Sequence, residues 1–305
     1  MSTNPELVQR IERRALSEHN TTTAYQPLTL HRWTHPTDPI SYMLSPNICL
    51  IGQGVKRVML GDEIYIYDAQ HFLLSSLDLP VTAEIMEASE EKPYLGLTLN
   101  LNLNLLSQLM MDSNLPAPER KLACQGVSVS PLEPDLLGAI YRLMDLLETP
   151  EDLPIMAPLI EKEICYRLLR GVQGPRLRQM VTHGSQSHSI ARAVQWLKQS
   201  YRESFKVSDL AHRVGMSDSA FYAHFRELTT MTPLQFQKKL RLEEARRLML
   251  TQDQDAASAS FMVGYESPSQ FNREYKRLFG MPPLKDIKQL RQFSEAGTYS
   301  RMSPD

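Results

Sequence analysis

The chain has 305 residues, enough for two domains with separate cores, and its 42% hydrophobic and 22% charged residues are ordinary for a globular protein. Its polar N-terminus lacks the pattern of a secretory signal, and no segment holds the ~20 consecutive apolar residues that a membrane span needs. Three widely spaced cysteines, Cys49, Cys124 and Cys165, suit neither a disulfide framework nor a zinc site. We therefore predict a cytoplasmic protein with reduced thiols and no membrane contact.

The net charge of −2 conceals an asymmetry between the two halves of the chain. Residues 1–187 carry 15 Lys and Arg against 22 Asp and Glu, a net charge of −7. Residues 188–293 carry 17 against 11, a net charge of +6, and the last twelve residues add −1. This distribution indicates that only the second half contacts a polyanion.

Residues 40–102 show the pattern of a small all-β domain. Residues 55–60 and 64–67 are rich in β-branched and aromatic side chains, and they flank Gly61-Asp62-Glu63, which suits a hairpin turn. Further short strands are expected at residues 71–76, 81–86 and 94–101. Short strands at regular spacing predict a sandwich or a small barrel.

Apolar residues recur at helical spacing from about residue 133. They form one run before the proline-rich segment 149–158 and a second run after Pro158, which predicts a helical hairpin. The apolar stripe of this hairpin leaves two arrangements open: it forms a homodimer interface, or it packs on the β domain of its own chain. The residues concerned are Leu136, Leu143, Leu147, Ile164 and Leu168.

Glycines, serines and Pro175 between residues 171 and 188 indicate a linker, after which the chain is helical almost to residue 293. The predicted fold class is α+β: a small β-barrel or sandwich with a helical hairpin, followed by an all-α domain. The expected domain limits are 1–173, a linker at 174–188, an all-α domain at 189–293 and a flexible tail at 294–305.

One supersecondary unit occurs twice in the all-α region. Residues 214–221 resemble residues 263–271, with one extra residue in the second turn, and the correspondence then continues at an offset of 50 residues. Gly215 follows a first helix, where positive φ is needed, and Ser217 is placed to cap a second helix. The predicted buried stripes of the second helices are Phe221, Phe225 and Leu228 in one copy and Phe271, Tyr275 and Leu278 in the other. Such a unit is a helix-turn-helix.

The outward faces of these second helices are candidate DNA-reading surfaces. The residues are Ser219, Tyr222, Ala223 and Arg226 in the first copy, and Ser269, Gln270, Asn272, Arg273 and Lys276 in the second. Between the copies, residues 233–250 predict one helix of roughly 25 Å, which would hold the two reading helices about one turn of DNA, ~34 Å, apart. We expect Arg273 to read a base and Lys276 to contact a phosphate.

At these residues the chain resembles the AraC/XylS family of transcriptional regulators. The match covers about residues 188–291, and its most specific part comprises residues 263–267, 270–277 and 279–283. An arginine that is frequent in the first recognition helix of the family is Ala223 here, which shifts the expected base reading to Tyr222 and to the second helix. The resemblance implies a bacterial DNA-binding regulator of the activator type, with double-stranded DNA and RNA polymerase as partners.

The N-terminal half is similar to the cupin-like regulatory domain of one AraC-type subfamily. This similarity rests on residues 45–54, 60–62, 67–68, 78–81 and 91–94. It implies a small β-barrel that senses a small molecule and forms homodimers. Tyr65, Tyr67 and Phe72 are the candidate ligand-binding residues, because we expect them to point inward from their strands.

Two alternatives stay open. In the first, the barrel only dimerises and the regulator needs no ligand. In the second, the barrel is a metal-dependent cupin enzyme. His31, His35 and His71 lack the close His-x-His spacing of such a site, so we expect no metal. The sequence shows no nucleophile elbow, P-loop or dinucleotide fingerprint, so we expect no catalytic residue and no cofactor.

Overall fold

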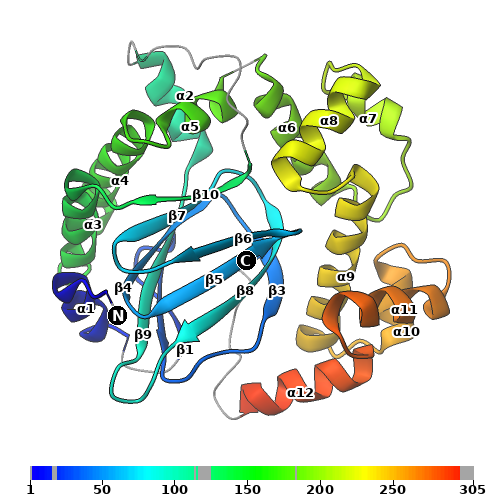
Figure 1. Cartoon of the computed structure of the whole chain (residues 1–305), viewed down its shortest axis with the longest axis horizontal. Coiled ribbons are helices and arrows are strands. Elements are labelled where there is room, and N and C mark those ends of the chain that lie inside the picture. The colour runs from blue at the N-terminus through cyan, green and yellow to red at the C-terminus, as the bar shows by residue number, and fades with distance from the viewer. Residues whose placement is uncertain (1, 16–18, 113–114, 116–124, 183, 296–305) are drawn as a thin grey trace.

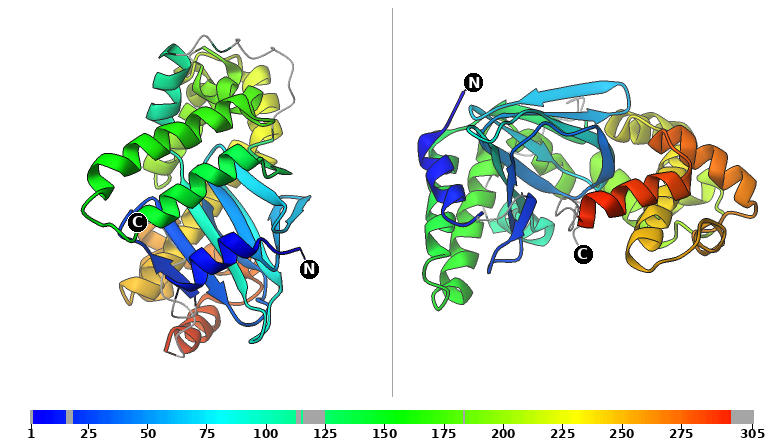
Figure 2. Two further views of the ribbon diagram at one scale, coloured as in Figure 1. Left: turned by 90° about the vertical axis from the view of Figure 1, so that its left-hand side faces the viewer. Right: turned by 90° about the horizontal axis from the view of Figure 1, so that it is seen from below.

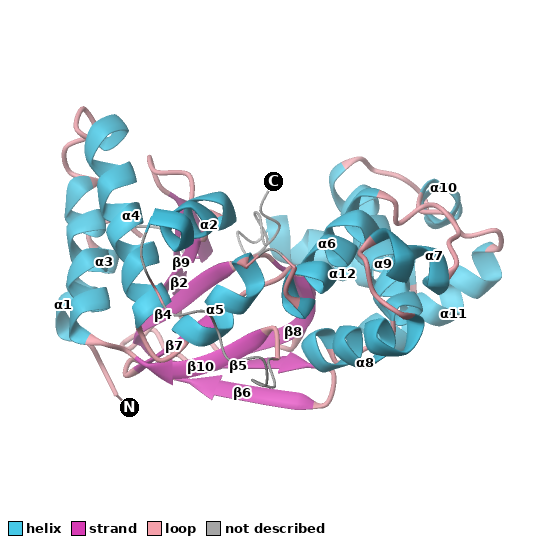
Figure 3. Ribbon diagram, turned by 90° about the horizontal axis from the view of Figure 1, so that it is seen from above, coloured by secondary structure: helices cyan, strands magenta, loops and turns pink. Residues whose placement is uncertain are grey.

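The computed structural model describes residues 2–15, 19–112, 115, 125–182 and 184–295. A β domain occupies the middle of the molecule, with helices on one side of it and a second, all-helical domain on the other (Figure 1, Figure 3). The α+β prediction is confirmed. The predicted tail lies largely outside the described residues.

The β domain consists of two facing antiparallel sheets. The six-stranded sheet has the order β1 (His19–Thr22), β2 (Leu28–Trp33), β9 (Tyr94–Asn100), β4 (Asn47–Gln53), β7 (His71–Ser75) and β10 (Val127–Pro131). The four-stranded sheet has the order β3 (Ile40–Leu44), β8 (Leu79–Glu87), β5 (Val55–Leu60) and β6 (Glu63–Tyr67). The predicted hairpin is β5–β6, with Gly61 at φ +61° in its turn. The first two strands and β10 were not predicted.

The six-stranded sheet is buried on both faces. Alternate residues of β4 belong to two different cores: Cys49 and Ile51 face the four-stranded sheet, whereas Ile48 and Leu50 face helices. Residues 48–51 are consequently all buried, which explains their continuous apolar run.

Five helices cover the outer face of this sheet: α1 (Pro5–Glu12), α2 (Leu103–Asp112), α3 (Pro134–Leu146), α4 (Leu153–Arg170) and α5 (Gly174–Val181). Figure 2 shows α3 and α4 lying side by side across it, so the helical hairpin is confirmed. The start of its second helix differs from the prediction. Pro158 lies inside α4, close to its N-terminus, where its missing N–H removes a single helical hydrogen bond.

The apolar stripe of the hairpin packs within the chain. Leu136, Leu143, Ile164 and Leu168 are almost completely buried in the core between helices and sheet, and Leu147 packs against the same core. Of the two arrangements left open, the structure therefore supports packing on the β domain. Four of these five side chains are buried within the chain, and Leu147 is partly buried against the same core.

The predicted linker is largely helical. Residues 174–181 form α5, whose Leu177 and Val181 belong to the core that the hairpin shares with the sheet. The next helix, α6, already begins at Gln186. The serines and glycines of this segment therefore mark the ends of two helices, and Ser185 caps α6 by accepting a hydrogen bond from the His188 amide.

The C-terminal domain consists of α6 (Gln186–Gln199), α7 (Val207–Arg213), α8 (Asp218–Thr229), α9 (Pro233–Thr251), α10 (Ala256–Met262), α11 (Pro268–Phe279) and α12 (Pro283–Glu295). In Figure 1, α9 runs between a lobe that contains α7 and α8 and a lobe that contains α10 and α11. Among the described residues, no helix combines the length and the apolar character that a bilayer crossing requires.

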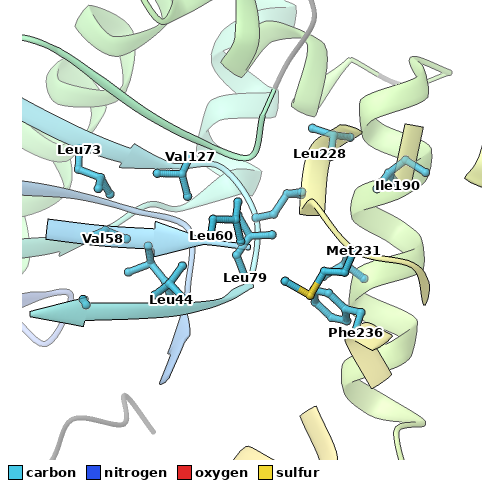
Figure 4. Packing of buried hydrophobic residues seen from close by; sticks show 14 of the residues in the cluster. Leu44, Val58, Leu60, Leu73, Leu79, Val127, Ile190, Leu228, Met231 and Phe236 are labelled. Atoms are coloured by element: carbon cyan, nitrogen blue, oxygen red, sulfur yellow. The ribbon is translucent and has the colours of Figure 1, made fainter. Parts of the chain in front are cut away.

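The two domains share one hydrophobic core. Figure 4 shows Leu44, Leu60 and Leu79 at the end of the four-stranded sheet, opposite Met231 and Phe236. The backbones of the two domains are also hydrogen-bonded to each other, because the amide of Gly126 donates a hydrogen bond of 2.9 Å to the Leu228 carbonyl. The Lys198 ammonium lies 2.6 Å from the Asp78 carboxylate. The C-terminal end of α8 is thus docked on the β domain.

Candidate nucleic-acid interface and interior cavity

The first helix-turn-helix is formed by α7 and α8. Gly215, at φ +76°, lies in the turn between them, and the Ser217 hydroxyl caps α8 by accepting a hydrogen bond from the Ala220 amide. The predicted stripe of Phe221, Phe225 and Leu228 is buried. This burial leaves the opposite face of α8 to solvent.

The second helix-turn-helix repeats this construction with α10 and α11. Gly264 has φ +89°, and Ser267 caps α11 by accepting a hydrogen bond from the Gln270 amide. Phe271 and Tyr275 are fully buried, while Leu278 is only partly buried. Both halves of the sequence repeat therefore adopt the predicted unit.

All nine predicted DNA-reading residues are exposed. On α8 these are Ser219, Tyr222, Ala223 and Arg226, and on α11 they are Ser269, Gln270, Asn272, Arg273 and Lys276. Tyr222 is the large side chain of the first face, with 43% of its surface exposed. The two faces thus offer polar side chains, one tyrosine and three cations to a partner.

The cations on these faces have no carboxylate partner among the described residues: no ion pair involves Arg226, Arg273 or Lys276. Glu274, a neighbour of Arg273 in the sequence, is instead held by Lys238 at 2.8 Å and by the Tyr265 hydroxyl at 2.7 Å. Gln270 also donates to Glu274. Arg273 and Lys276 are therefore available to a polyanion.

Arg241 of α9 holds the two lobes together. Its guanidinium donates hydrogen bonds to the carbonyls of Tyr201, Arg202 and Glu203 before the first motif and to the carbonyl of Gly264 in the second. The capping box of Thr232 and Gln235 fixes the start of α9. The relative orientation of the two reading helices is consequently built into the domain.

The β domain contains a cavity of about 320 Å³ between its two sheets. Strands β1 to β5, β8 and β9 contribute its wall, which combines apolar residues such as Trp33, Leu44 and Ile85 with polar residues such as Asn47 and Thr98. The other half of the interior, toward β6, β7 and α8, is filled with aliphatic side chains (Figure 4). Only one half of the space between the sheets is therefore hollow.

Two basic residues face this cavity. His31 is bonded through Nδ1 to Asn20 Oδ1 at 2.7 Å and through Nε2 to Thr98 Oγ1 at 2.8 Å. Burial, and secondarily the charge of Lys56, lowers the pKa of His31 to about 3, so the imidazole is neutral at physiological pH. The second residue, Lys56, enters from β5 beside Tyr42.

The predicted ligand-binding residues have different positions. Tyr65 and Tyr67 point into the interior as expected, but they pack beside the cavity wall in the shared core. Phe72 points the other way: β7 directs its alternate residues outward, and Phe72 lies in the helix-covered core. The prediction for Phe72 is wrong, because in a sheet buried on both faces apolar character does not tell inside from outside.

Sequence reasoning missed Tyr42, Lys56 and Tyr94 as cavity residues. A signal was present in β5, where Lys56 shares a face with the buried Val58 and Leu60, since residues two apart on a strand point the same way. A lysine on the same strand face as two core residues is unusual, and it indicates a polar space inside the domain.

No group of three or more His, Cys, Asp or Glu side chains is arranged to hold a metal ion in the part of the chain that the structure describes. The three candidate histidines are engaged otherwise: His31 by Asn20 and Thr98, His35 by Thr34, and His71 by Asp68. Cys49 and Cys165 are buried free thiols, and Cys124 lies outside the described residues.

Comparisons with known proteins agree with this architecture. The family model for the N-terminus of AraC-type transcriptional regulators matches residues 24–176, about half of the chain, and a helix-turn-helix domain model matches residues 210–289. The HTH-type transcriptional regulator ExsA of Pseudomonas aeruginosa is 27% identical over 160 residues, 52% of this chain and 57% of that protein. The match thus spans little more than half of ExsA.

Two longer matches cover most of the chain. The HTH-type transcriptional regulator YdeC of Bacillus subtilis is 21% identical over 284 residues, 88% of this chain and 94% of that protein. The crystal structure of ToxT from Vibrio cholerae with a bound unsaturated fatty acid has a TM-score of 0.56 at 13% identity, covering 89% of this chain and 97% of that chain. The likeness to ToxT concerns the fold.

Proposed function

The chain belongs to the family of AraC-type transcriptional regulators, and from this premise we propose that it regulates transcription by binding specific duplex DNA through α8 and α11. One observation carries the proposal: two capped helices of a repeated unit expose polar and cationic faces, while their apolar faces are buried. Helices of this kind enter the major groove, and two on one rigid domain suit successive turns of the duplex.

The second motif supplies most of the base recognition in this proposal. Arg273 can donate two hydrogen bonds to guanine O6 and N7, a contact worth ~1–3 kcal/mol of discrimination. Lys276 contributes a phosphate contact. On α8, Tyr222 takes the main role because Ala223 offers no hydrogen-bonding group.

We further propose that the cavity of the β domain binds a small-molecule effector. In support, the cavity is lined by convergent polar groups on an apolar wall, and the ToxT structure, which has a similar fold, contains a bound fatty acid. We also propose RNA polymerase as a partner, and the cytoplasm, where chromosomal DNA lies, as the location of the protein. A homodimer would use a surface other than the buried stripe of α3 and α4.

The test uses the full chain and a pool of random duplexes, from which bound DNA is selected and sequenced. We expect a defined motif to be enriched, and log K for that motif to fall with log salt by ~0.9 per phosphate contact. A folded chain that retains no duplex at low ionic strength would overturn the proposal. Sedimentation of the same sample measures dimerisation.

A further inference from the structure

Lys56 is a cation inside the β domain with no anion beside it. Its side chain lines the cavity, with Nζ 5.9 Å from the centre of the Tyr42 ring. No ion pair involves Lys56 within the described ranges of the chain. Glu84, a carboxylate of the cavity wall, is paired with Arg57, which points away from the interior on the same strand.

No carboxylate is among the groups that act on the charge of Lys56. Tyr42, Tyr94 and Cys49 are the titratable groups that act on it, and His31, whose pKa is lowered by burial and by the charge of Lys56 itself, is bonded to Asn20 and Thr98. Burial acts to lower the pKa of the Lys56 ammonium, but Tyr42, Tyr94 and Cys49 outweigh it, so its pKa stays above the ordinary value. The cavity therefore contains one full positive charge with only dipoles to balance it.

A second polar group near this charge has no oxygen or nitrogen partner. The Tyr67 hydroxyl is buried, with 2% of the residue exposed, and its hydrogen-bonding neighbour among the described residues is the thiol of Cys49, a weak partner. Its titratable neighbours are Cys49, Tyr94 and Tyr42, the residues that also surround Lys56. Buried hydroxyls are rarely left unpaired, because each such group costs free energy. The Tyr67 hydroxyl thus lies behind the cavity wall, next to three residues that line the cavity.

The rest of the cavity is shaped for a small organic body. Trp33, Met43, Leu44, Ala83 and Ile85 supply apolar wall. A volume of about 320 Å³ is at the small end of the range of ligand pockets. A wall of this kind favours a ligand that has an acidic head and an apolar body.

We propose that this cavity binds a small organic carboxylate whose acidic group is held by Lys56, with the hydroxyls of Tyr42 and Tyr94 around it. This inference rests on the proposed role of the cavity as an effector site. An ion pair in a partly desolvated space is stronger than one at the surface, so the charge of Lys56 discriminates acids from neutral and basic compounds of the same shape.

The experiment compares compounds of one shape and three charges on the full chain. The probes are octanoate, octanamide and octylamine, and benzoate, benzamide and benzylamine, each at millimolar concentration. Thermal unfolding and calorimetric titration are measured for the wild type, Lys56→Met, Lys56→Arg and Lys92→Gln. Lys92 is an exposed lysine of the same domain and is the matched control.

At least one carboxylate is expected to raise the Tm and to bind more tightly than its amide and its amine. Lys56→Met should weaken this carboxylate by roughly tenfold or more, Lys56→Arg should retain most of its binding, and Lys92→Gln should behave as the wild type. Without ligand, Lys56→Met should be at least as stable as the wild type, because it removes a partly buried charge that no described carboxylate neutralises.

Several results would overturn the inference. They are carboxylates that bind no better than their amides, a wild-type Tm that responds to none of the six probes, unchanged carboxylate affinity in Lys56→Met, or a ligand-free Lys56→Met that is strongly destabilised. If the neutral compounds bound as tightly as the carboxylates, the cavity would be an effector site for ligands of another chemical class. DNA binding, measured on the same samples, reports separately on the proposed regulator.

Discussion

Arg273 and Lys276 lie about one helical turn apart on the exposed face of α11, and their cationic groups differ in shape and in hydrogen-bonding geometry. A guanidinium presents a planar fork that matches a base edge, whereas an ammonium is a point charge that suits phosphate. Neither residue is neutralised by a carboxylate of the described chain, and Glu274 is occupied by Lys238 and Tyr265.

We therefore expect Arg273→Ala to weaken binding to the selected motif by ~1–3 kcal/mol and to flatten base preference at one position. Lys276→Ala should weaken selected and scrambled duplexes alike and lower the salt slope by about one. Binding to both duplexes over a range of salt measures this, with Lys285→Ala, on α12, as the control. Equal losses on both duplexes for Arg273→Ala would make it a phosphate contact.

His31 makes the stability of the β domain sensitive to acid. Its pKa is about 3 in the folded chain, against 6.5 for an unperturbed histidine, so the unfolded chain takes up the proton first as the pH falls. The contribution of neutral His31 is complete above about pH 6.5 and is lost progressively toward pH 3. We expect His31→Gln to flatten the pH dependence of the free energy of unfolding between these values. Parallel curves for wild type and variant in urea titrations would contradict this.

At the scale of elements, the two helix-turn-helix units differ at the glycine of the turn. Both glycines have positive φ, +76° at Gly215 and +89° at Gly264. A Cβ at Gly215 would meet no atom within 4 Å, whereas a Cβ at Gly264 would lie 2.4 Å from the Arg202 carbonyl oxygen. Gly264 therefore also allows the second unit to approach the chain that precedes the first, where Arg241 links the two.

The pair of glycines gives a matched experiment. Gly215→Ala should cost about 1–2 kcal/mol, the penalty of a left-handed residue with a Cβ. Gly264→Ala should cost clearly more, because backbone must move as well, and should weaken DNA binding by disturbing the orientation of α11. Chemical denaturation and DNA titration measure both effects. If the two variants were equally stable, the close approach to Arg202 would have no energetic weight.

At the scale of the molecule, the shared core couples the β domain to the first helix-turn-helix. Leu44 belongs to both regions of interest, since it lines the cavity and lies in the core that includes Met231 and Phe236. Helix α9 packs against β3, the strand that carries Leu44 and Tyr42. The proposed ligand would therefore contact β3, the strand against which α9 of the DNA-binding domain packs.

Met231→Asp tests this docking. Met231 is 5% exposed in the shared core, so a carboxylate there would be buried without a partner, and we expect the domains to separate. Calorimetry should then resolve two unfolding transitions in place of one, and small-angle scattering should give a larger radius of gyration. Leu234→Asp, three residues away and 47% exposed, is the control and should change neither. Unchanged scattering for Met231→Asp would show that the contact does not hold the domains together.

Local patterns in the sequence were sufficient to predict which faces of α8 and α11 are exposed. The spacing of Phe221 and Phe225 marks the buried face of α8, and that of Phe271 and Tyr275 marks the buried face of α11. Because an α-helix has 3.6 residues per turn, Tyr222 and Arg273 then lie on the opposite face of their helices. The capping residues and turn glycines of both units also lie within a few residues of the helix ends that they stabilise. Such relations need no knowledge of the rest of the chain.

The cavity and the docking of the domains were decided only by the tertiary structure. Phe72 and Lys56 illustrate the difference: which face of β7 is inside, and whether the space beside Lys56 is filled or hollow, depend on seven strands and on helices distant in the sequence. The contact of Leu79 with the end of α8 likewise joins residues about 150 positions apart. Periodicity assigns a side chain to a face, but packing between distant segments determines what that face meets.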